Sequence, residues 1–512
     1  MNVSFDYVIA GAGTAGCVLA RRLLERTDAT VALLEVGGPA DRDEVIRADI
    51  PAVTSLWGNP EVAWLHRTVP QPGLGGREVD IPQGRVVGGS GSINALMYVR
   101  GNPGDFDHWR SLGNPRWGYA DLLPYFKAAE RYEGGPSSLR GGTGPLHVAR
   151  YREPSQATKA FLSAATKLGY ADGDWDYNGD RQAGGAFVYQ STREGGERRS
   201  STATAYLEPV LTDRRLTVVT GTLIDRVELA GTKAVGVRLA PGGDLVRASR
   251  EVIVSCGTLS SPAVLMRSGI GPPAHLAEHG IDPRVILPGV GQNLHDHLLV
   301  GVGYASQVDL APPELIAEGG LFTEISHDVP ELQFFFGPVQ FIDDEYRTEG
   351  PGFTFAPVLL HPRSRGELLL RSAHPAELPL VNPRYLEQEA DVRVLVRGIS
   401  LARELAATPA FTGIRDRELA PGPDTDLVSY VRRSATTVWH PVGTCAMGSG
   451  DAAVVDAELR VHGVTGLRVV DASIMPAITS GNTNAPTIMI AERAADLITA
   501  SGEGLIAAGG ER

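Results

Sequence analysis

The residues most able to do chemistry form a glycine-rich turn close to the start of the chain. The turn reads Gly11-Ala12-Gly13-Thr14-Ala15-Gly16 and directly follows the apolar run Tyr7-Val8-Ile9-Ala10. In a G-x-G-x-x-G turn the first glycine allows a tight bend, the second lets the backbone approach a pyrophosphate, and the third packs helix against strand. The start of the following helix then presents its N–H groups to the phosphates. The spacing therefore predicts a site for a dinucleotide.

An acidic residue completes the unit that would bind the dinucleotide. Apolar positions at helical spacing follow the turn, and a second predicted strand, residues 31–34, ends at Glu35. Glu35 lies 19 positions after Gly16, close to the spacing of roughly 20 at which a carboxylate reaches a ribose hydroxyl. A glycine-rich turn alone can be purely structural, but the full strand–turn–helix–strand–acid unit favours dinucleotide binding.

Length and composition limit the kind of protein that this chain can be. It has 512 residues, more than the roughly 250–300 that one hydrophobic core serves, so at least two domains are expected. A net charge of −13 argues against a nucleic-acid partner, because a phosphate backbone needs a basic surface. The sequence has no apolar run of about 18 residues, so no membrane span is expected.

The number and spacing of the cysteines, together with the N-terminal residues, favour a cytoplasmic location for the protein. Cys17, Cys256 and Cys445 are odd in number and widely separated, so neither a disulfide framework nor a zinc site is expected. The stretch before the first apolar run carries Asp6 and no Lys or Arg, which makes it a poor signal peptide. We therefore expect a cytoplasmic protein and leave its oligomeric state open.

Strand and helix patterns are interleaved along the chain. Strand-like runs occur at 7–10, 216–219, 234–239, 251–254 and 467–470. Helical spacing occurs over 155–169, 391–406 and 488–498. Between 298 and 436 the character changes to aromatic strand-like runs and Pro-rich loops. A discontinuous cofactor domain with an inserted second domain fits this order better than domains joined end to end.

Several further motifs resemble the glucose–methanol–choline (GMC) family of FAD-dependent oxidoreductases. They occur in the family's order and are spread over nearly the whole chain. The motifs are Arg85-x-x-Gly88-Gly89-Ser90-x-Ser92-x-Asn94, Gly257-Thr258-Leu259-Ser260-Ser261-Pro262, Gly289-Val290-Gly291-Gln292-Asn293-Leu294, Ser364-Arg365-Gly366, Trp439-His440-Pro441-Val442-Gly443-Thr444 and Asp471-Ala472-Ser473-Ile474-Met475-Pro476. Within the family, these motifs are most similar to those of the choline-dehydrogenase-like branch.

The resemblance implies an α/β fold with two domains. One is a discontinuous, Rossmann-like FAD-binding domain, to which we assign residues 1–155, 196–297 and 437–512. The other is an inserted α+β substrate-binding domain that carries an antiparallel sheet, and we assign 156–195 and 298–436 to it.

The resemblance also implies which residues hold FAD. The pyrophosphate is assigned to Gly11, Gly13, Thr14, Ala15 and Gly16, and the ribose to Glu35. The turn Asn94-Ala95-Leu96-Met97 is expected against the ring system, Ile224 at the adenine, and Asp471 and Ala472 at the pyrophosphate and ribityl chain. The other expected contacts are Trp64, Arg85, Gly88, Ser92, Asn484 and Thr487. Some family oxidases attach the flavin through a histidine at the position that Ile93 occupies here, so we expect non-covalent FAD.

Alcohol oxidation by a flavin needs removal of the hydroxyl proton and transfer of a hydride from the α-carbon to flavin N5. A histidine within hydrogen-bond reach suits the first task, and the resemblance assigns it to His440. The second catalytic position falls on Asn482, which would hydrogen-bond the substrate oxygen, with Asn484 near the flavin pyrimidine edge. The closeness of the two asparagines leaves open which of them has which role.

Four other features have simpler interpretations than catalysis. His295-Asp296-His297 has metal-ligand spacing, but no further ligand cluster accompanies it, so we expect no metal. The run Phe334-Phe335-Phe336 is expected to be either a substrate wall or a buried core strand. The pair Arg198-Arg199 is expected to be solvated, and Cys445 to be an inert buried thiol.

The leading functional hypothesis is FAD-dependent oxidation of a primary alcohol to the aldehyde, with O2 or another electron acceptor. A non-redox enzyme of the same fold, of the hydroxynitrile lyase or photodecarboxylase type, is the alternative. A nicotinamide-dependent dehydrogenase would leave the later motifs unexplained, and a non-catalytic binding protein would leave the whole set without a purpose. The stretch between His297 and Leu332 is short for a choline-dehydrogenase-like protein. It favours a larger or more polar alcohol than choline, sugar-like or aromatic.

Overall fold

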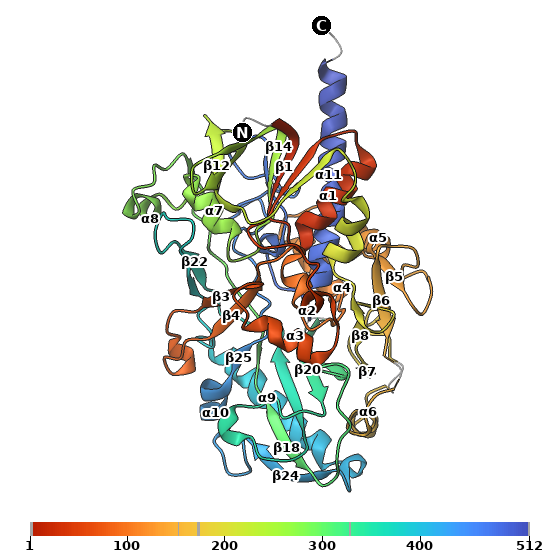
Figure 1. Cartoon of the computed structure of the whole chain (residues 1–512). Helices are drawn as coiled ribbons and strands as arrows, with labels where there is room; N and C mark the ends of the chain where they lie inside the picture. Colours follow the sequence, from red (N-terminus) through yellow and green to blue (C-terminus); the bar gives the residue numbers. More distant parts are fainter. Residues whose placement is uncertain (1–3, 152, 172–174, 327–328, 510–512) are drawn as a thin grey trace.

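Two β-sheets, one towards each end of the molecule, organise the chain (Figure 1). The structure is a computed structural model, and it describes residues 4–151, 153–171, 175–326 and 329–509. Helices and short strands lie around the first sheet and join it to the second.

The first sheet is built from the most continuous apolar runs of the sequence. Its strands in spatial order are β11 (Leu216–Val219), β2 (Val31–Leu34), β1 (Ser4–Ala10), β14 (Leu245–Val254), β13 (Lys233–Ala240) and β12 (Leu223–Ala230), with β26 (Leu467–Val469) also on β14. Strands β11, β2, β1, β14 and β26 are parallel to one another, whereas β13 pairs antiparallel with β14 and with β12. All four residues of β2 are buried, as expected for a parallel strand covered on both faces. Ala10 pairs with Leu34 and with Val254, so these strands end at one edge.

Two helices from opposite ends of the chain pack beside each other against this sheet. They are α1 (Thr14–Arg26) and α11 (Asn484–Gly509). Arg22 of α1 forms an ion pair of 2.7 Å with the fully buried Glu492 of α11. The hydroxyl of Tyr206 also donates a hydrogen bond to this carboxylate. This contact ties the last part of the chain to the glycine-rich turn at the start of α1.

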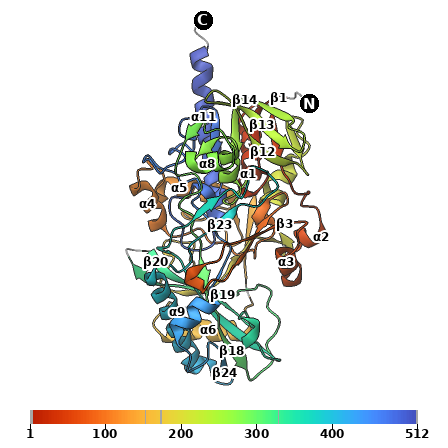
Figure 2. The ribbon, with the colours of Figure 1, turned by 90° about the vertical axis from the view of Figure 1, so that its left-hand side faces the viewer.

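The second sheet is antiparallel and aromatic. Its strands are β24 (Arg415–Ala420), β18 (Val302–Ser306), β21 (Gly352–Leu359), β20 (Val329–Gly337), β19 (Gly319–Ser326) and β7 (Ala186–Val188); β17 (Leu298–Leu299) also pairs with β21, and β25 (Thr436–Thr437) pairs with β17. Helices α6 (Gln156–Lys167), α9 (Glu389–Ala407) and α10 (Leu427–Ser434) complete this part (Figure 2). Phe161 of α6 stacks on Phe336 with ring centroids 4.7 Å apart.

Further short elements connect the two sheets. They are α2 (Asp43–Ile46), α3 (Ile50–Trp57), β3 (Ala63–Arg67), β4 (Asp80–Gly84), α4 (Pro103–Ser111), α5 (Tyr119–Ala129), β5 (Glu130–Tyr132), β6 (Leu146–Arg150), β8 (Gln190–Ser191), β9 (Arg193–Glu194), β10 (Arg198–Arg199), α7 (Ser261–Arg267), β15 (Ile270–Gly271), α8 (Pro273–Glu278), β16 (Val285–Ile286), β22 (Glu367–Leu369) and β23 (Leu380–Asn382).

The expected fold class is confirmed: a parallel sheet follows the glycine-rich turn, and a separate antiparallel sheet is built largely from the 298–436 stretch. The helices expected over 155–169 and 391–406 are α6 and α9. The last helix begins four residues before the expected start at 488, because a proline is tolerated in a first helical turn. The bounds of the two domains stay a prediction.

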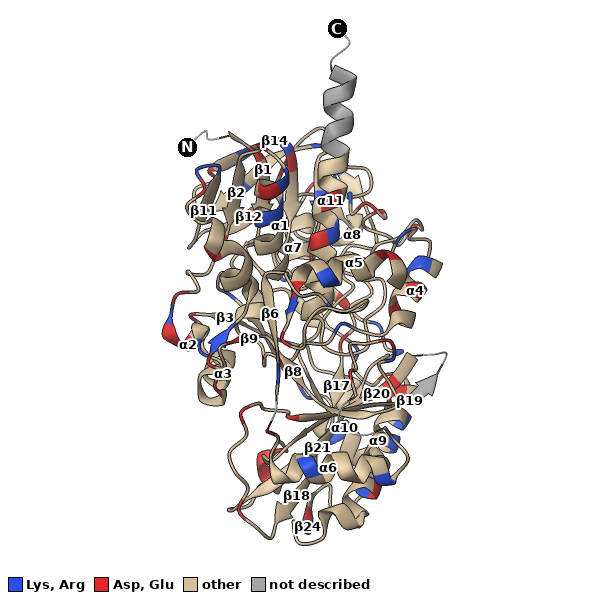
Figure 3. Cartoon of the chain, turned by 90° about the vertical axis from the view of Figure 1, so that its right-hand side faces the viewer, with Lys and Arg blue, Asp and Glu red and all other residues tan. Residues whose placement is uncertain are grey.

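Charge and hydropathy add two observations. Figure 3 shows Lys and Arg segments interspersed with Asp and Glu segments along the ribbon, with no continuous basic stretch. Among the described helices, none combines the length and the apolar character needed to cross a membrane.

Candidate active site

A cavity of about 520 Å³ lies where the two sheets face each other. Residues of both sheets and of the connecting loops line it. The sequence-predicted residues in its wall are Gly11, Gly13, Thr14, Ala15, Glu35, Trp64, Asn94, Ala95, Leu96, Met97, Ile224, His440, Asp471, Ala472, Asn482, Asn484 and Thr487. The fold therefore brings together residues from both ends of the chain, such as Gly11 and Thr487.

Four predicted residues lie behind this wall and shape it. A Cβ on Gly16 would overlap the carbonyl oxygen of Gly11, so Gly16 lets α1 pack closely on the turn. The N–H of Gly88 donates to the carbonyl of Ala12 at 2.7 Å. The hydroxyl of Ser92 donates to the carbonyl of Val87 at 2.8 Å. The guanidinium of Arg85 lies over the ring of Trp64, 4.9 Å from its centroid.

The glycine-rich turn forms an open cradle at the start of α1. Gly11 has φ = +102°, and a Cβ there would overlap the carbonyl of Ser255 on the neighbouring strand. No side chain caps the helix at Gly13, so the first N–H groups of α1 are available to an anion. This end of the cavity suits a pyrophosphate.

Glu35 lies beside the cradle and is almost fully buried. Its carboxylate accepts hydrogen bonds from the N–H of Ala12 at 3.0 Å and from the N–H of Gly37 at 2.8 Å. Burial raises the pKa of Glu35 to about 7, although these N–H donors oppose the rise. A carboxyl held in this way can accept a hydrogen bond from a ribose hydroxyl.

Polar groups on the opposite side of the cradle complete the fit to a dinucleotide. Asp471 accepts hydrogen bonds from the hydroxyl of Ser261 at 2.6 Å and from the N–H of Gly257 at 2.9 Å. The hydroxyls of Ser255 and Thr258 are buried in the cavity wall and have no partner within the described residues. Because buried hydroxyls are normally hydrogen-bonded, these two groups fit a polar ligand such as the FAD that the resemblance implies.

The turn from Asn94 to Met97 is held from beneath by Arg199. This guanidinium donates to the carbonyl of Asn94 at 2.7 Å and to its side-chain oxygen at 2.8 Å. Our expectation of a solvated arginine pair is wrong for Arg199, which is only 1% exposed, whereas Arg198 points outward. Successive side chains of β10 point to opposite sides, which is why one arginine is buried. Burial lowers the pKa of Arg199 to about 9.

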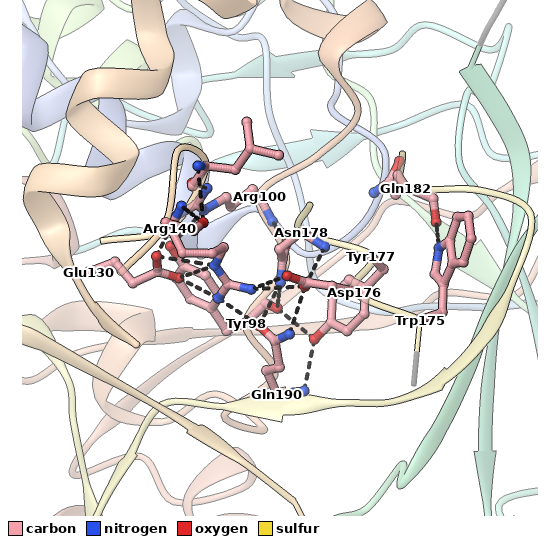
Figure 4. A network of polar contacts seen from close by, with 12 residues as sticks. Tyr98, Arg100, Glu130, Arg140, Trp175, Asp176, Tyr177, Asn178, Gln182 and Gln190 are labelled. Carbon is pink, nitrogen blue, oxygen red and sulfur yellow. Dashed lines mark hydrogen bonds and ion pairs between the residues drawn. The ribbon is translucent and has the colours of Figure 1, made fainter. Parts of the chain in front are cut away.

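A buried polar network anchors the segment that follows this turn (Figure 4). The carbonyl of Tyr98 accepts hydrogen bonds from the hydroxyl of Tyr177 at 2.9 Å and from the amide of Asn178 at 3.1 Å. Arg100 and Arg140 both pair with the fully buried Glu130. The network thus fixes the segment after Met97 to the segments at 130–140 and 177–178.

His440 and Asn482 lie next to each other in the cavity wall. The amide nitrogen of Asn482 lies 3.3 Å from Nε2 of His440. Asn484 instead lies next to Thr14, with 3.1 Å between its Oδ1 and the threonine hydroxyl. The structure therefore places Asn482 beside the histidine and Asn484 beside the cradle.

The segment that resembled a metal motif supports His440 from behind. Nδ1 of His297 lies 3.0 Å from Nδ1 of His440. Asp296 accepts a hydrogen bond of 2.7 Å from the main-chain N–H of His440, and others from Thr437 and Tyr385. Burial lowers the pKa of His440 to about 3 and lowers that of His297 strongly. Both imidazoles are therefore neutral near pH 7.

The other simple interpretations can be compared with the structure directly. No group of three or more possible metal ligands occurs among the described side chains. His295 is hydrogen-bonded to the carbonyl of Asn293 and to the N–H of Ile478. Cys445 is buried, and burial raises the pKa of its thiol. Phe334 and Phe336 are fully buried, whereas Phe335 is only partly buried; Phe335 and Phe336 both line the cavity.

Sequence reasoning missed two features of the wall. His66 is 2% exposed, and neither of its ring nitrogens has a partner within the described part of the chain. His66 lies two residues after Trp64 on β3. Because alternate residues of a strand point to the same face, the predicted contact at Trp64 is the one sequence signal that could have placed His66 in the wall. The second feature is an apolar surface, here called the chamber wall, formed by Met97, Leu299, Ala317, Phe335, Ala356 and Val438.

Comparisons with known proteins agree with this site. Family models described as GMC oxidoreductase match residues 5–299 and 362–491. The oxygen-dependent choline dehydrogenase of Brucella canis is 39% identical over 96% of this chain and 95% of its own length. The mitochondrial choline dehydrogenase of Mus musculus is 40% identical over 96% and 89%. The pyridoxine 4-oxidase structure from Mesorbium loti has a TM-score of 0.91 and 32% identity, covering 96% of this chain and 98% of the oxidase.

Proposed function

The chain belongs to the GMC oxidoreductase family, and on that premise we propose that it oxidises a primary alcohol to the aldehyde with His440 as the general base. At the coarser level it is an FAD-dependent oxidoreductase that acts on CH–OH groups. The observation that carries the proposal is the pairing of His440 with Asn482 in the wall of the cavity that also contains the dinucleotide cradle.

FAD would lie along the cradle and extend towards the catalytic pair. Gly11 and Gly13 would leave room for the pyrophosphate, Glu35 would bind the ribose, and the Asn94–Met97 turn would support the ring. When bound, FAD supplies the acceptor for the hydride that leaves the alcohol carbon. The protein offers no histidine at position 93, which holds Ile93, so we propose that the flavin is not covalently attached.

His440 can accept the hydroxyl proton because it is neutral and lies in the cavity wall. Nδ1 of His440 faces Nδ1 of His297, so one of these two nitrogens carries the hydrogen and donates it to the other. If His440 donates that hydrogen, the lone pair of its Nε2 points towards the amide nitrogen of Asn482, and the alcohol would take the place of this contact on binding. The alcohol O–H then donates to Nε2, and the amide nitrogen of Asn482 donates to the same oxygen. The hydroxyl proton ends on His440 as the hydride leaves the carbon.

The backbone of His440 is fixed so that the ring can act without rearranging. Asp296 holds the main-chain N–H of His440, while Thr437 and Tyr385 occupy the other oxygen of that carboxylate. Burial raises the pKa of Asp296 to about 6. These contacts position the base; Thr437 lines the cavity, whereas Asp296 and Tyr385 lie behind its wall.

The test is the rate of flavin reduction in His440→Ala. The variant is expected to retain FAD but to be reduced by alcohol about 10²–10⁴-fold more slowly, the usual contribution of a positioned base. His108→Ala, which removes an exposed histidine on α4, is the matched control and is expected to match the wild type. An unchanged rate in His440→Ala, measured by anaerobic stopped flow, would remove His440 from the mechanism.

A further inference from the structure

The surface next to the catalytic pair is apolar on several sides. Leu299 follows His297 by two residues on β17, and Val438 precedes His440 by two residues. The N–H of Val438 donates to the carbonyl of His297 at 3.2 Å, which holds these two segments together. Leu299 and Val438 therefore flank the two histidines, and the other members of the chamber wall pack in the same hydrophobic cluster.

The chamber wall contains one aromatic ring with small neighbours. Phe335 on β20 pairs with Ala356 on β21 and with Gly320 on β19. Its side chain is only partly buried, so part of the ring is open to the cavity. Ala317 and Ala356 occupy little of the space beside it. A flat apolar group can therefore pack against this ring.

Carboxylates are placed away from the chamber wall. Within the described residues, the cavity is lined by three carboxylates, Glu35, Asp471 and Glu377. The first two belong to the dinucleotide cradle, and Glu377 is exposed to solvent. Glu318 directly follows Ala317 in sequence but does not line the cavity. It accepts hydrogen bonds from Thr158 at 2.6 Å and from the N–H of Ser155 at 3.0 Å.

Building on the proposed function, we propose that the substrate is an uncharged alcohol with an apolar, aromatic-sized body, and that the chain selects against quaternary ammonium alcohols. A cation that enters the chamber loses its hydration and meets no carboxylate in the chamber wall, and one phenylalanine ring replaces only part of that lost hydration. An apolar body instead gains from the loss of its own hydration. The preference thus differs from the substrate named in the choline dehydrogenases that the chain resembles.

The experiment compares choline with its uncharged isostere, 3,3-dimethylbutan-1-ol, and with benzyl alcohol. The purified FAD-loaded protein is mixed anaerobically with each alcohol, and the second-order rate constant of flavin reduction is measured. The rate constant for the isostere is expected to exceed that for choline at least about tenfold, and the rate constant for benzyl alcohol is expected to exceed that for the isostere. A rate for choline equal to or above that of its isostere would overturn the inference. Failure of every alcohol to reduce the flavin would count against the proposed function instead.

Two variants at one position test whether the chamber wall sets this preference. Phe335→Leu keeps the position apolar and is expected to slow flavin reduction by benzyl alcohol more than flavin reduction by the isostere. Phe335→Glu adds a carboxylate and is expected to raise the ratio of choline to isostere at least about tenfold relative to Phe335→Leu. Retained FAD absorbance shows that each variant is folded. An unchanged ratio in Phe335→Glu would show that the chamber wall does not face the substrate.

Discussion

Replacing His66 with leucine is expected to make the stability of the protein less sensitive to acid. Burial lowers the pKa of His66 in the folded chain to about 4, whereas an unfolded histidine titrates near 6.5. Below pH 6.5 the unfolded chain therefore binds a proton that the folded chain does not, and stability falls as the pH falls towards 4. Because of this one group, the free energy of unfolding is about 2 kcal/mol lower at pH 5 than at pH 8. Leucine removes this titration.

The assay is urea unfolding of the FAD-loaded wild type and His66→Leu at pH 8 and at pH 5. Comparing the two pH values cancels the change in packing, which is the same at both. Between pH 8 and pH 5 the wild type should lose about 2 kcal/mol more unfolding free energy than the variant. Equal losses would refute the reasoning, because they would mean that the ring of His66 is already protonated or hydrogen-bonded at pH 5.

Three other outcomes follow from the site. Gly11→Ala is expected to lose bound FAD, seen as a lower ratio of visible to ultraviolet absorbance, whereas Gly38→Ala, which has open space around it, should retain it. Asn482→Ala should slow flavin reduction about tenfold or more with FAD still bound, and Asn484→Ala should weaken FAD binding instead; the reverse pattern would exchange their roles. Acid precipitation should release all the flavin into the supernatant, because Ile93 cannot form a histidyl link, and a coloured pellet would contradict this.

The sequence is most informative where the backbone itself makes the site. The glycine-rich turn, Glu35 and the strand between them are neighbours in the chain, so their joint geometry follows from local structure. The pairing of His440 with Asn482 is a contact between distant segments, and resemblance to a family pointed to it before the structure did. Without the family motifs, neither residue stands out among the other histidines and asparagines.

Other parts of the site depend on tertiary packing and could not be predicted. Arg199 is buried because β10 turns it towards Asn94, although a pair of adjacent arginines normally indicates a surface. Asp296 supports His440 only because the segments around 296 and 440 are paired in the fold. Of the phenylalanine run, Phe335 alone reaches the chamber wall as a partly buried side chain, and strand direction decides this.

The most direct test of the central claim is the visible spectrum of the purified protein, recorded anaerobically before and after adding benzyl alcohol. We expect an oxidised-flavin spectrum that bleaches with the alcohol, together with formation of the aldehyde. Admitting air afterwards then distinguishes an oxidase from a dehydrogenase. A protein that is colourless and cannot be reconstituted with FAD, or a flavin that no alcohol of a broad panel bleaches, would contradict the account.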